Sequence, residues 1–242
     1  MITYRHLQKV GIKIWLCLFL AIISTSAGNH LFAQNFYKER SGRNQTMGAG
    51  IGPGFIFADN GGIYRDLNFT LKPALSVHYG RRLNSWWQLR ATAGIQGLRS
   101  GGDYPIDVLQ VWDLRRSAFR FSGTALYADV MPMIQLRPFF NHMDRPTFNW
   151  YGGIGIGFLQ ASTTLYYSMS QNSPSRTQRL LTASFPVRSG VSYRLGDYGD
   201  ISLEGSLILT MTDEIDGNRG YNKLGDHLIN IQLQYTRYLK LK

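Results

Sequence analysis

The sequence predicts an all-β fold, an eight-stranded antiparallel transmembrane β-barrel preceded by a cleavable signal peptide. Eight stretches alternate apolar and polar residues with the period of two that a β-strand imposes. The connections between these stretches alternate between long and short, as they do in membrane barrels. After residue 34 no apolar run approaches the roughly 18 residues of a membrane-spanning helix, so a membrane form of this chain must be a closed barrel.

The first 33 residues have the order of a secretory signal peptide. Three basic residues and no acid come first, followed by the apolar run 14–23 and then by small and polar residues at 24–28. A helix needs about 20 apolar residues to cross a bilayer, so this run is expected to be removed rather than to anchor the chain. The cut is expected after Ala33, with Ala27 as the alternative.

Cys17 is the only cysteine, and it allows an alternative in which the chain is a lipoprotein cut just before a lipidated cysteine. Bulky residues precede Cys17 where such a site needs small ones, and this favours the ordinary signal peptide. The mature chain then has no cysteine, which excludes disulfides and thiolate metal or redox sites. Residues 34–45 are expected to form a short periplasmic segment, and residues 46–242 the barrel.

The formal net charge of +11 falls to +8 when residues 1–33 are removed, because they hold three basic residues and no acid. The basic residues are scattered rather than clustered, and an exported chain seldom meets nucleic acid, so nucleic-acid binding is not expected. Anionic headgroups of outer-membrane lipid, or an acidic partner surface, suit this charge better. No metal, cofactor or small-molecule substrate is expected.

The first four expected strands are residues 46–58, 69–80, 86–97 and 119–136. In the first three, apolar residues hold the odd positions, opposite glycines in the first strand and mostly polar residues in the other two. The fourth is apolar on both sides and contains Asp129 and Pro132, so a bulge is expected there.

The last four expected strands are residues 148–160, 180–195, 201–212 and 227–238. Apolar residues hold the even positions of the first of these, opposite Gly153, Gly155 and Gly157. In the other three they hold the odd positions, opposite mostly hydroxyl, amide and charged side chains. Each strand has about 12 residues, and about 9–11 suffice to cross a bilayer at a tilt.

Long polar connections are expected at residues 59–68, 99–118, 161–179 and 213–226. Shorter ones are expected at residues 81–85, 196–200 and, of intermediate length, 137–147. Long extracellular loops alternate with short periplasmic turns in outer-membrane barrels, so we expect an outer-membrane location with both chain ends in the periplasm. A soluble β-sandwich is the alternative, but it predicts no such asymmetry.

In a membrane barrel, lipid lies against the apolar side of each strand and the interior against the polar side. Within residues 86–97 the expected lipid-facing side chains are Trp87, Leu89 and Ile95. The expected inward side chains are Gln88, Arg90 and Gln96. Aromatic residues near the periplasmic strand ends are expected to form a girdle of Trp86, Trp87, Trp150, Tyr151, Tyr193, Tyr235 and Tyr238.

The interior of an eight-stranded barrel is just wide enough to be filled by inward side chains. The charged inward residues are expected to form a packed, ion-paired network that leaves no open pore, made of Lys72, Arg90, Asp129, Arg188, Arg194 and Glu204. The inward glycines of the first and fifth strands are expected to relieve crowding for the long Arg and Glu side chains opposite.

Three features could carry chemistry, and each has a plainer structural explanation. The stretches G-A-G-I-G-P-G and G-G-I-G-I-G repeat glycine at every second residue and lack the helix of a dinucleotide fingerprint. Ser76 and His78 share the inward face of one strand, but both are expected simply to line the interior. Asp213, Glu214 and Asp216 lack the spacing of a calcium loop, so a solvated loop or a salt-bridged strand end is expected. The protein is therefore expected not to be an enzyme.

The connection 137–147 is the longest expected periplasmic turn, and it carries residue types that are enriched in interface cores. Its candidate partner-docking residues are Arg137, Phe139, Phe140, Met143 and Arg145. The alternative is a proline-stiffened turn whose aromatic side chains rest among lipid headgroups. The basic segment 34–45 could serve the same periplasmic partner.

Several segments together resemble one known family. They are L-F-A-Q at the signal end, A-G-I-G-P-G-F, W-Y-G-G-I-G-I-G-F, F-P-V-R-S-G-V-S-Y-R-L and L-E-G-S-L-I-L-T-M-T-D-E-I-D. Over nearly all of residues 46–240 the chain resembles the PorG-like outer-membrane barrels associated with the type IX secretion machinery. It departs from them at Glu214-Ile215-Asp216, where the family often has aromatic-Leu-Asp, and at its Tyr-Leu-Lys-Leu-Lys end, which lacks a terminal aromatic.

The resemblance implies a non-enzymatic barrel that anchors the periplasmic ring of that secretion system, a lipoprotein and its partner, to the outer membrane. Two other functions also fit the residues. One is a small OmpA- or OmpW-like structural, adhesion or diffusion barrel that works through its outer loops. The other is a lipid-modifying barrel enzyme that uses Ser76 and His78.

Overall fold

The computed structural model of the protein describes residues 42–63, 68–101, 104–114, 117–167, 175–218 and 225–240. The expected signal peptide, residues 1–33, and most of the expected periplasmic segment lie outside these ranges. The end of that segment is described, and Gln45 already belongs to the first strand.

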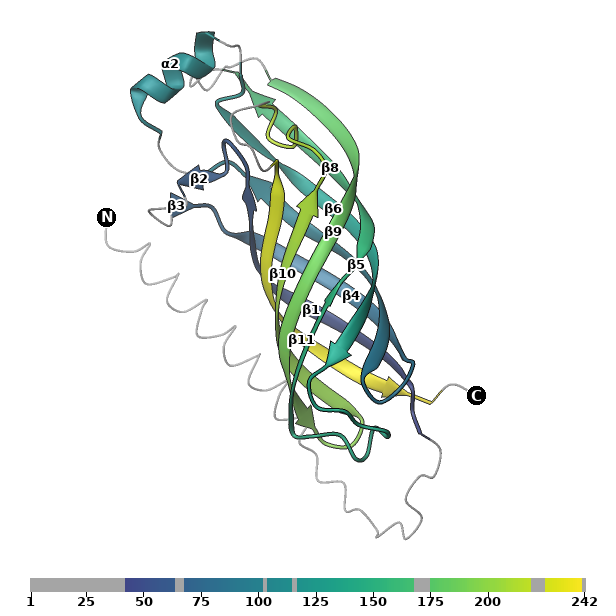
Figure 1. Ribbon diagram of the computed structural model, residues 1–242. Coiled ribbons are helices and arrows are strands. Elements are labelled where there is room, and N and C mark those ends of the chain that lie inside the picture. The colour runs from purple at the N-terminus through teal and green to yellow at the C-terminus, as the bar shows by residue number, and fades with distance from the viewer. Residues whose placement is uncertain are drawn as a thin grey trace, which may run out of the picture. The chain divides into compact units, whose positions relative to one another are not determined.

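Eight antiparallel strands close into a ring, as the sequence predicts (Figure 1). In chain order the wall consists of β1 (Gln45–Phe57), β4 (Lys72–Arg82), β5 (Trp87–Arg99), β6 (Arg120–Gln135), β7 (Phe148–Ile154), β8 (Ile156–Tyr166), β9 (Ser175–Leu195), β10 (Gly199–Thr210) and β11 (His227–Leu239). β7 and β8 together make the fifth strand, which is divided at Gly155. Pairing of β1 with β11 closes the ring, so the backbone groups of the first and last strands satisfy each other.

The structure corrects some expected strand boundaries. Residues 68–69 do not begin the second wall strand, because they form β3 (Asn68–Phe69), which pairs with β2 (Gly62–Ile63) in a separate hairpin. β8 and β9 reach well into the expected loop 161–179. The expected bulge in the fourth strand is wrong, since β5 and β6 pair in unbroken register and Pro132 simply faces outward. This strand is apolar on both sides because one face is outward and the other meets the core.

A short helix, α2 (Ile106–Leu114), occupies part of the connection 99–118, for which the sequence predicts only a polar loop. Pro105 stands directly before the helix and Asp107 in its first turn, and both residue types are favourable at a helix start. Trp112 is the one buried residue of α2, and its ring lies 4.8 Å from that of Tyr104. With so little of the helix buried, no amphipathic pattern in the sequence indicates it.

The barrel has two unlike ends. The short-turn end holds the connections 83–86, 136–147 and 196–198, and the long-loop end holds the other connections and α2. At the long-loop end β6, β8 and β9 continue beyond the ring (Figure 1). Pairing of β9 with β10 stops at Ser184–Thr210, whereas its pairing with β8 runs on to Ser175–Tyr166.

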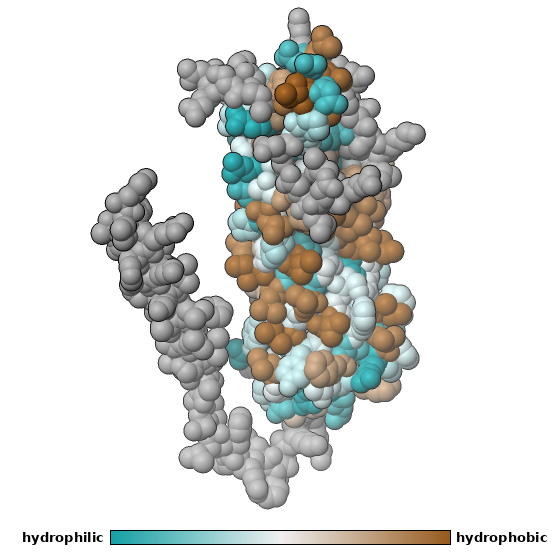
Figure 2. Space-filling view, turned by 90° about the vertical axis from the view of Figure 1, so that its left-hand side faces the viewer, coloured by the Kyte–Doolittle hydropathy of each residue, from teal (hydrophilic) through white to brown (hydrophobic). Residues whose placement is uncertain are grey.

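Apolar side chains cover the outward face of the wall. Trp87, Leu89 and Ile95 are exposed, whereas Arg90 and Gln96 are buried inside the ring, which confirms the expected sides of this strand. Figure 2 shows brown, apolar side chains over the middle of the wall and more polar ones toward its lower end. A continuous apolar belt is unfavourable in water and favourable against hydrocarbon. In the described ranges, no helix combines the length and the apolarity needed to cross a bilayer.

The barrel interior has two layers. Toward the long-loop end the inward side chains form an apolar core that includes Phe121, Leu159, Leu165, Ile208 and Leu228. Toward the short-turn end the inward side chains are mostly polar or charged, apart from a small apolar cluster of Met131, Met133 and Tyr151. The expectation of a polar interior is therefore wrong for the long-loop half, where close apolar packing fills the ring.

Glycines on the inward face make room for side chains from the neighbouring strands. A Cβ atom on Gly48 would lie 2.5 Å from Cε1 of His78, and one on Gly54 would lie 2.6 Å from Cδ of Gln96. At Gly48 the added Cβ would also lie 2.5 Å from the backbone oxygen of Tyr235, so this position requires glycine, whereas at Gly54 the Gln96 side chain would have to shift. The expected relief of crowding is present in β1. The side chains that occupy the space, however, are His78 and Gln96 rather than the expected arginine and glutamate.

Candidate functional site

A layer of paired charges crosses the interior of the barrel. Arg188 of β9 makes a bidentate ion pair with Asp129 of β6, with N–O distances of 2.6 and 2.7 Å. Both side chains are only 2% exposed. Arg188 also donates to the hydroxyls of Ser206, at 3.1 Å, and Thr92, at 3.3 Å. The guanidinium group thus links its own strand, β9, to β5, β6 and β10. Its planar shape matches that of the carboxylate it binds.

Glu204 of β10 completes this layer. Its carboxylate lies 2.5 Å from the Arg90 guanidinium of β5 and accepts a 2.8 Å hydrogen bond from the Gln234 side chain of β11. Arg188 lies 3.7 Å from the same carboxylate. Two arginines, one aspartate and one glutamate therefore cancel in charge, and pairing of this kind offsets the cost of removing ions from water. We call these four residues the charge layer: Arg90, Asp129, Arg188 and Glu204.

The other two residues of the expected interior network lie elsewhere, so their inclusion is wrong. Arg194 is half-buried at the short-turn end, where it pairs with Asp197 of the adjoining turn at 2.9 Å. Lys72 is half-buried at the first position of β4, at the long-loop end, and lines a hollow in the wall. Both stand at strand ends, where alternation along the strand no longer fixes the position of a long side chain.

Ser76 and His78 line the interior, as expected, and do not form a catalytic pair. The Ser76 hydroxyl donates to the side-chain oxygen of Gln232 at 2.5 Å. Nε2 of His78 lies 3.1 Å from the Thr236 hydroxyl. A nucleophile needs its base within hydrogen-bond reach, and here each group bonds to β11 instead. Among the residues that the structure describes, no group of His, Asp or Glu side chains is arranged to hold a metal ion.

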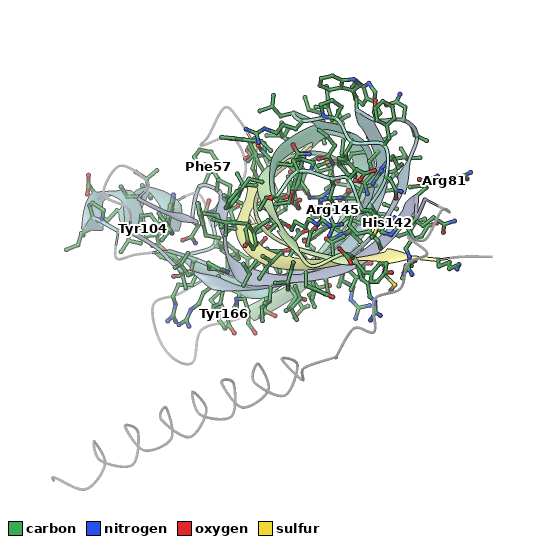
Figure 3. All side chains as sticks on the ribbon, turned by 90° about the horizontal axis from the view of Figure 1, so that it is seen from below. Phe57, Arg81, Tyr104, His142, Arg145 and Tyr166 are labelled. Carbon is green, nitrogen blue, oxygen red and sulfur yellow. The ribbon has the colours of Figure 1, made fainter. Side chains whose placement is uncertain are left out.

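Arg145, from the connection 136–147, closes the short-turn end of the barrel. It is 4% exposed, and its Nε donates to Asp200 at 2.7 Å. Its terminal nitrogens donate to four backbone carbonyl groups, those of His142, Gly196, Asp197 and Gly199. In Figure 3, which looks along the barrel from below, Arg145 and His142 lie within the ring of strands.

Aromatic side chains support this closure. Arg145 lies 4.6 Å from the ring centroid of Tyr238, whose hydroxyl donates to Asp200 at 2.9 Å. Arg82 lies 3.8 Å from the ring centroid of Phe139. The connection 136–147 therefore packs across the end of the barrel and closes it, rather than extending away from it. We call this segment the stopper.

The five candidate docking residues divide into two groups. Arg145 and Phe139 are buried, at 4% and 8% exposure, because they build the stopper. Arg137 and Phe140 are exposed, Phe140 by 82%, and Met143 is half-buried. Only the exposed pair and part of Met143 are therefore accessible to a partner, and docking through them stays a prediction.

The expected aromatic girdle is partly wrong. Tyr151 and Tyr238 are buried and point inward, toward Arg90 and Arg145 respectively. The other five aromatic residues are exposed on the outward face or at the short-turn rim: Trp86, Trp87, Trp150, Tyr193 and Tyr235. Parity already separates Tyr151 from Trp150, since neighbouring residues of a strand face opposite ways.

At the long-loop end a buried polar network ties three connections together. Asp216 accepts hydrogen bonds from the backbone N–H groups of Asn60, at 2.8 Å, and Asn218, at 2.9 Å. Asn218 and Asn60 in turn bond to the backbone of Ala118. Asp226 accepts the backbone N–H of Ile215 at 2.7 Å. The expectation of a solvated acidic loop is wrong for Asp216, which is fully buried.

Burial raises the pKa of both carboxyl groups in this network, to about 7 for Asp216 and about 9 for Asp226. Desolvation disfavours the charged form, and the neighbouring carboxylate of Asp213 raises both pKa values further. No spacing motif marks this network, because its members come from connections far apart in sequence. At the short-turn end, Arg43 and Asp200 could not be predicted for the same reason, because the backbone N–H of Arg43 donates to His142, 99 residues away, and Asp200 pairs with Arg145, 55 residues away.

Neither a family model nor a curated protein matches the chain in sequence. Among solved structures, the chain is similar to Neisserial surface protein A, with a TM-score of 0.51 and 9% identity over 81% of this chain and 97% of that one. It is also similar to Ail, the attachment invasion locus protein of Yersinia pestis, with a TM-score of 0.44 and 12% identity over 81% of this chain and 99% of that one. A major outer membrane protein from Thermus thermophilus gives a TM-score of 0.44 and 12% identity over 80% of this chain and 98% of that one. The closed ring of eight antiparallel strands and the similarity to Neisserial surface protein A together show that the chain has the fold of eight-stranded outer-membrane barrels.

Proposed function

We propose that the protein is a non-enzymatic, non-conducting outer-membrane barrel. Its rigid wall holds in place the loops, the helix and the strand extensions at its long-loop end. The charge layer carries the proposal, because its paired side chains from four strands fill the ring where a solute would have to pass. The stopper built on Arg145 lies below this layer, and the apolar core lies above it. A barrel filled at three levels is suited to holding a surface in place rather than to conducting solutes.

The long-loop end is the part that differs most from a bare barrel. β6, β8 and β9 rise beyond the ring there, and α2 and the β2–β3 hairpin are added to it. In outer-membrane barrels the longer loops are extracellular, so we assign these elements to the cell surface and the short-turn end to the periplasm. Contact with other cells, surfaces or envelope components through these elements is the function that this architecture supports best.

Conductance and loop removal test this proposal together. The purified chain in a planar bilayer is expected to give no steady channels, and a variant with α2 (residues 106–114) replaced by a short Gly-Ser linker is expected to keep the barrel but lose surface attachment by whole cells. Ser76→Ala and His78→Ala should change neither the lipid composition of the cell envelope nor attachment. Stable single-channel conductance of the unmodified protein would overturn the proposal.

A second candidate function is periplasmic docking to a secretion assembly, as the PorG-like resemblance implies. The supporting observation is the exposure of Phe140 and of neighbouring Leu136, by 82% and 67%, at the short-turn end. A photo-crosslinker placed at Phe140 should then capture periplasmic lipoprotein or ring components, whereas one placed at buried Phe139 should not. Normal secretion and an unchanged ring in a deletion strain would eliminate this candidate.

A further inference from the structure

A basic hollow lies in the wall at the long-loop end. It has a volume of about 650 Å³ and lies across the ends of β4, β5, β6 and β8. Its lining contains three basic residues, the hydroxyl residues Ser100 and Ser122, and Tyr166. The basic residues are Lys72, Arg99 and Arg120. In the part of the chain that the structure describes, no acidic residue lines the basic hollow.

The basic hollow stands directly beyond the apolar belt. Leu75, Ile95 and Leu126 are outward, exposed and paired side by side on β4, β5 and β6. On the same strands, the three basic residues lie three to six positions from these apolar residues, nearer the long-loop end. At about 3.3 Å per residue this is roughly 10–20 Å along the strands, and less in height because membrane strands tilt by about 35–45°. The basic groups therefore lie near the level at which lipid headgroups replace hydrocarbon.

These three positive charges contrast with the arginines of the interior. Each interior arginine of the charge layer has a carboxylate at 2.5–2.7 Å, whereas none of the three at the basic hollow forms an ion pair with a described residue. Arg99 and Arg120 are exposed, and Arg120 lies over the ring of Tyr166 at 5.8 Å. Three uncompensated cations around one concavity, with hydroxyl groups between them, suit an anion that carries several charges.

We propose that the basic hollow binds the phosphate groups of a phosphorylated glycolipid of the outer leaflet. Arg99 and Arg120 are exposed on the same face of the wall as Leu75, Ile95 and Leu126. A bound lipid can therefore lay its acyl chains on these three apolar residues while its phosphates meet the basic residues. A soluble anion would gain nothing from the apolar residues. The inference rests on the outer-membrane location proposed above, but not on the function of the loops.

Native mass spectrometry of the mature chain in detergent, titrated with bis-phosphorylated lipid A, tests the site. Arg99→Gln/Arg120→Gln should weaken binding at least tenfold, and adding Lys72→Gln should weaken it further. The matched control, Arg81→Gln/Arg237→Gln, removes two exposed outward arginines at the other end and should stay within about twofold of the unmodified chain. Dephosphorylated lipid A should bind the unmodified chain as weakly as lipid A binds the Arg99/Arg120 variant.

Two outcomes would overturn the site. One is equal weakening by the two double variants, which would mean non-specific charge attraction. The other is displacement of lipid A by inorganic phosphate alone, which would mean a free-anion site. A folded barrel migrates differently on a gel before and after heating, so comparing heated and unheated samples shows whether each variant folds. If the double variant does not fold, the single variants Arg99→Gln and Arg120→Gln are tested in its place. A chain that never inserts into vesicles would count against the outer-membrane proposal instead.

Discussion

Removal of Asp129 is the sharpest test of the charge layer. Arg188 loses both contacts of its bidentate pair, and its nearest remaining carboxylate is Glu204 at 3.7 Å, which Arg90 already holds at 2.5 Å. The layer changes from neutral to a net +1 within a site where the Arg188 side chain is 2% exposed. Breaking a buried pair in this way costs about 3–5 kcal/mol, so Asp129→Ala should shift the unfolding equilibrium by roughly 100-fold or more.

Urea unfolding in phospholipid vesicles, followed by tryptophan fluorescence and by gel mobility of unheated samples, measures this cost. Asp129→Leu/Arg188→Met removes both partners and should be clearly more stable than either single variant, because no unpaired charge remains. Asp197→Ala is the matched control: its pair with Arg194 has the same chemistry but a 51% exposed carboxylate, and should cost less than about 1 kcal/mol. If Asp129→Ala costs no more than this control, the charge layer does not stabilise the barrel as argued.

Three further substitutions test the two ends of the barrel and the pairing of β1 with β11 that closes the ring. Arg145→Ala should destabilise the barrel by about 3 kcal/mol because Asp200 is left buried without its ion-pair partner, with only the Tyr238 hydroxyl still donating to it. Loss of the exposed Arg137 should not destabilise the barrel, and equal melting temperatures of the two variants in micelles would contradict the stopper. Gly52→Ala should impair closure of the ring, since its Cβ would clash with the carbonyl of Ile231 on β11; Gly205→Ala, whose Cβ meets nothing nearer than 3.9 Å, should be neutral in refolding yield. The raised pKa of Asp226 means that the fold favours its protonated form, so the contribution of this group to stability is greatest below about pH 4 and is lost as the pH rises through about 9. Asp226→Asn should flatten that loss and stabilise the chain by about 1 kcal/mol or more at pH 8, measured by hydrogen exchange of residues 213–218; an unchanged pH profile would refute the assignment.

Much of the central interior could be predicted from alternation alone. Arg90, Asp129, Arg188 and Glu204 stand in mid-strand, where a residue's parity fixes its side of the wall, and they are inward as predicted. Their pairing partners could not be predicted, because Asp129 and Arg188 are 59 residues apart and meet only through the register of the ring. Lys72, Arg194 and Arg145 stand at or beyond strand ends, where backbone direction and not parity decides the position of the side chain.

The sequence by itself determined the number of wall strands, the side each mid-strand residue faces, and the alternation of long and short connections. All of these follow from local periodicity and composition. Only the tertiary structure decided that the connection 136–147 folds across the barrel end, that the long-loop half of the interior is apolar, and that Asp216 and Asp226 are buried together. These features depend on contacts between segments far apart in the chain, and such contacts exist only once strand register and closure of the ring have set which ends meet.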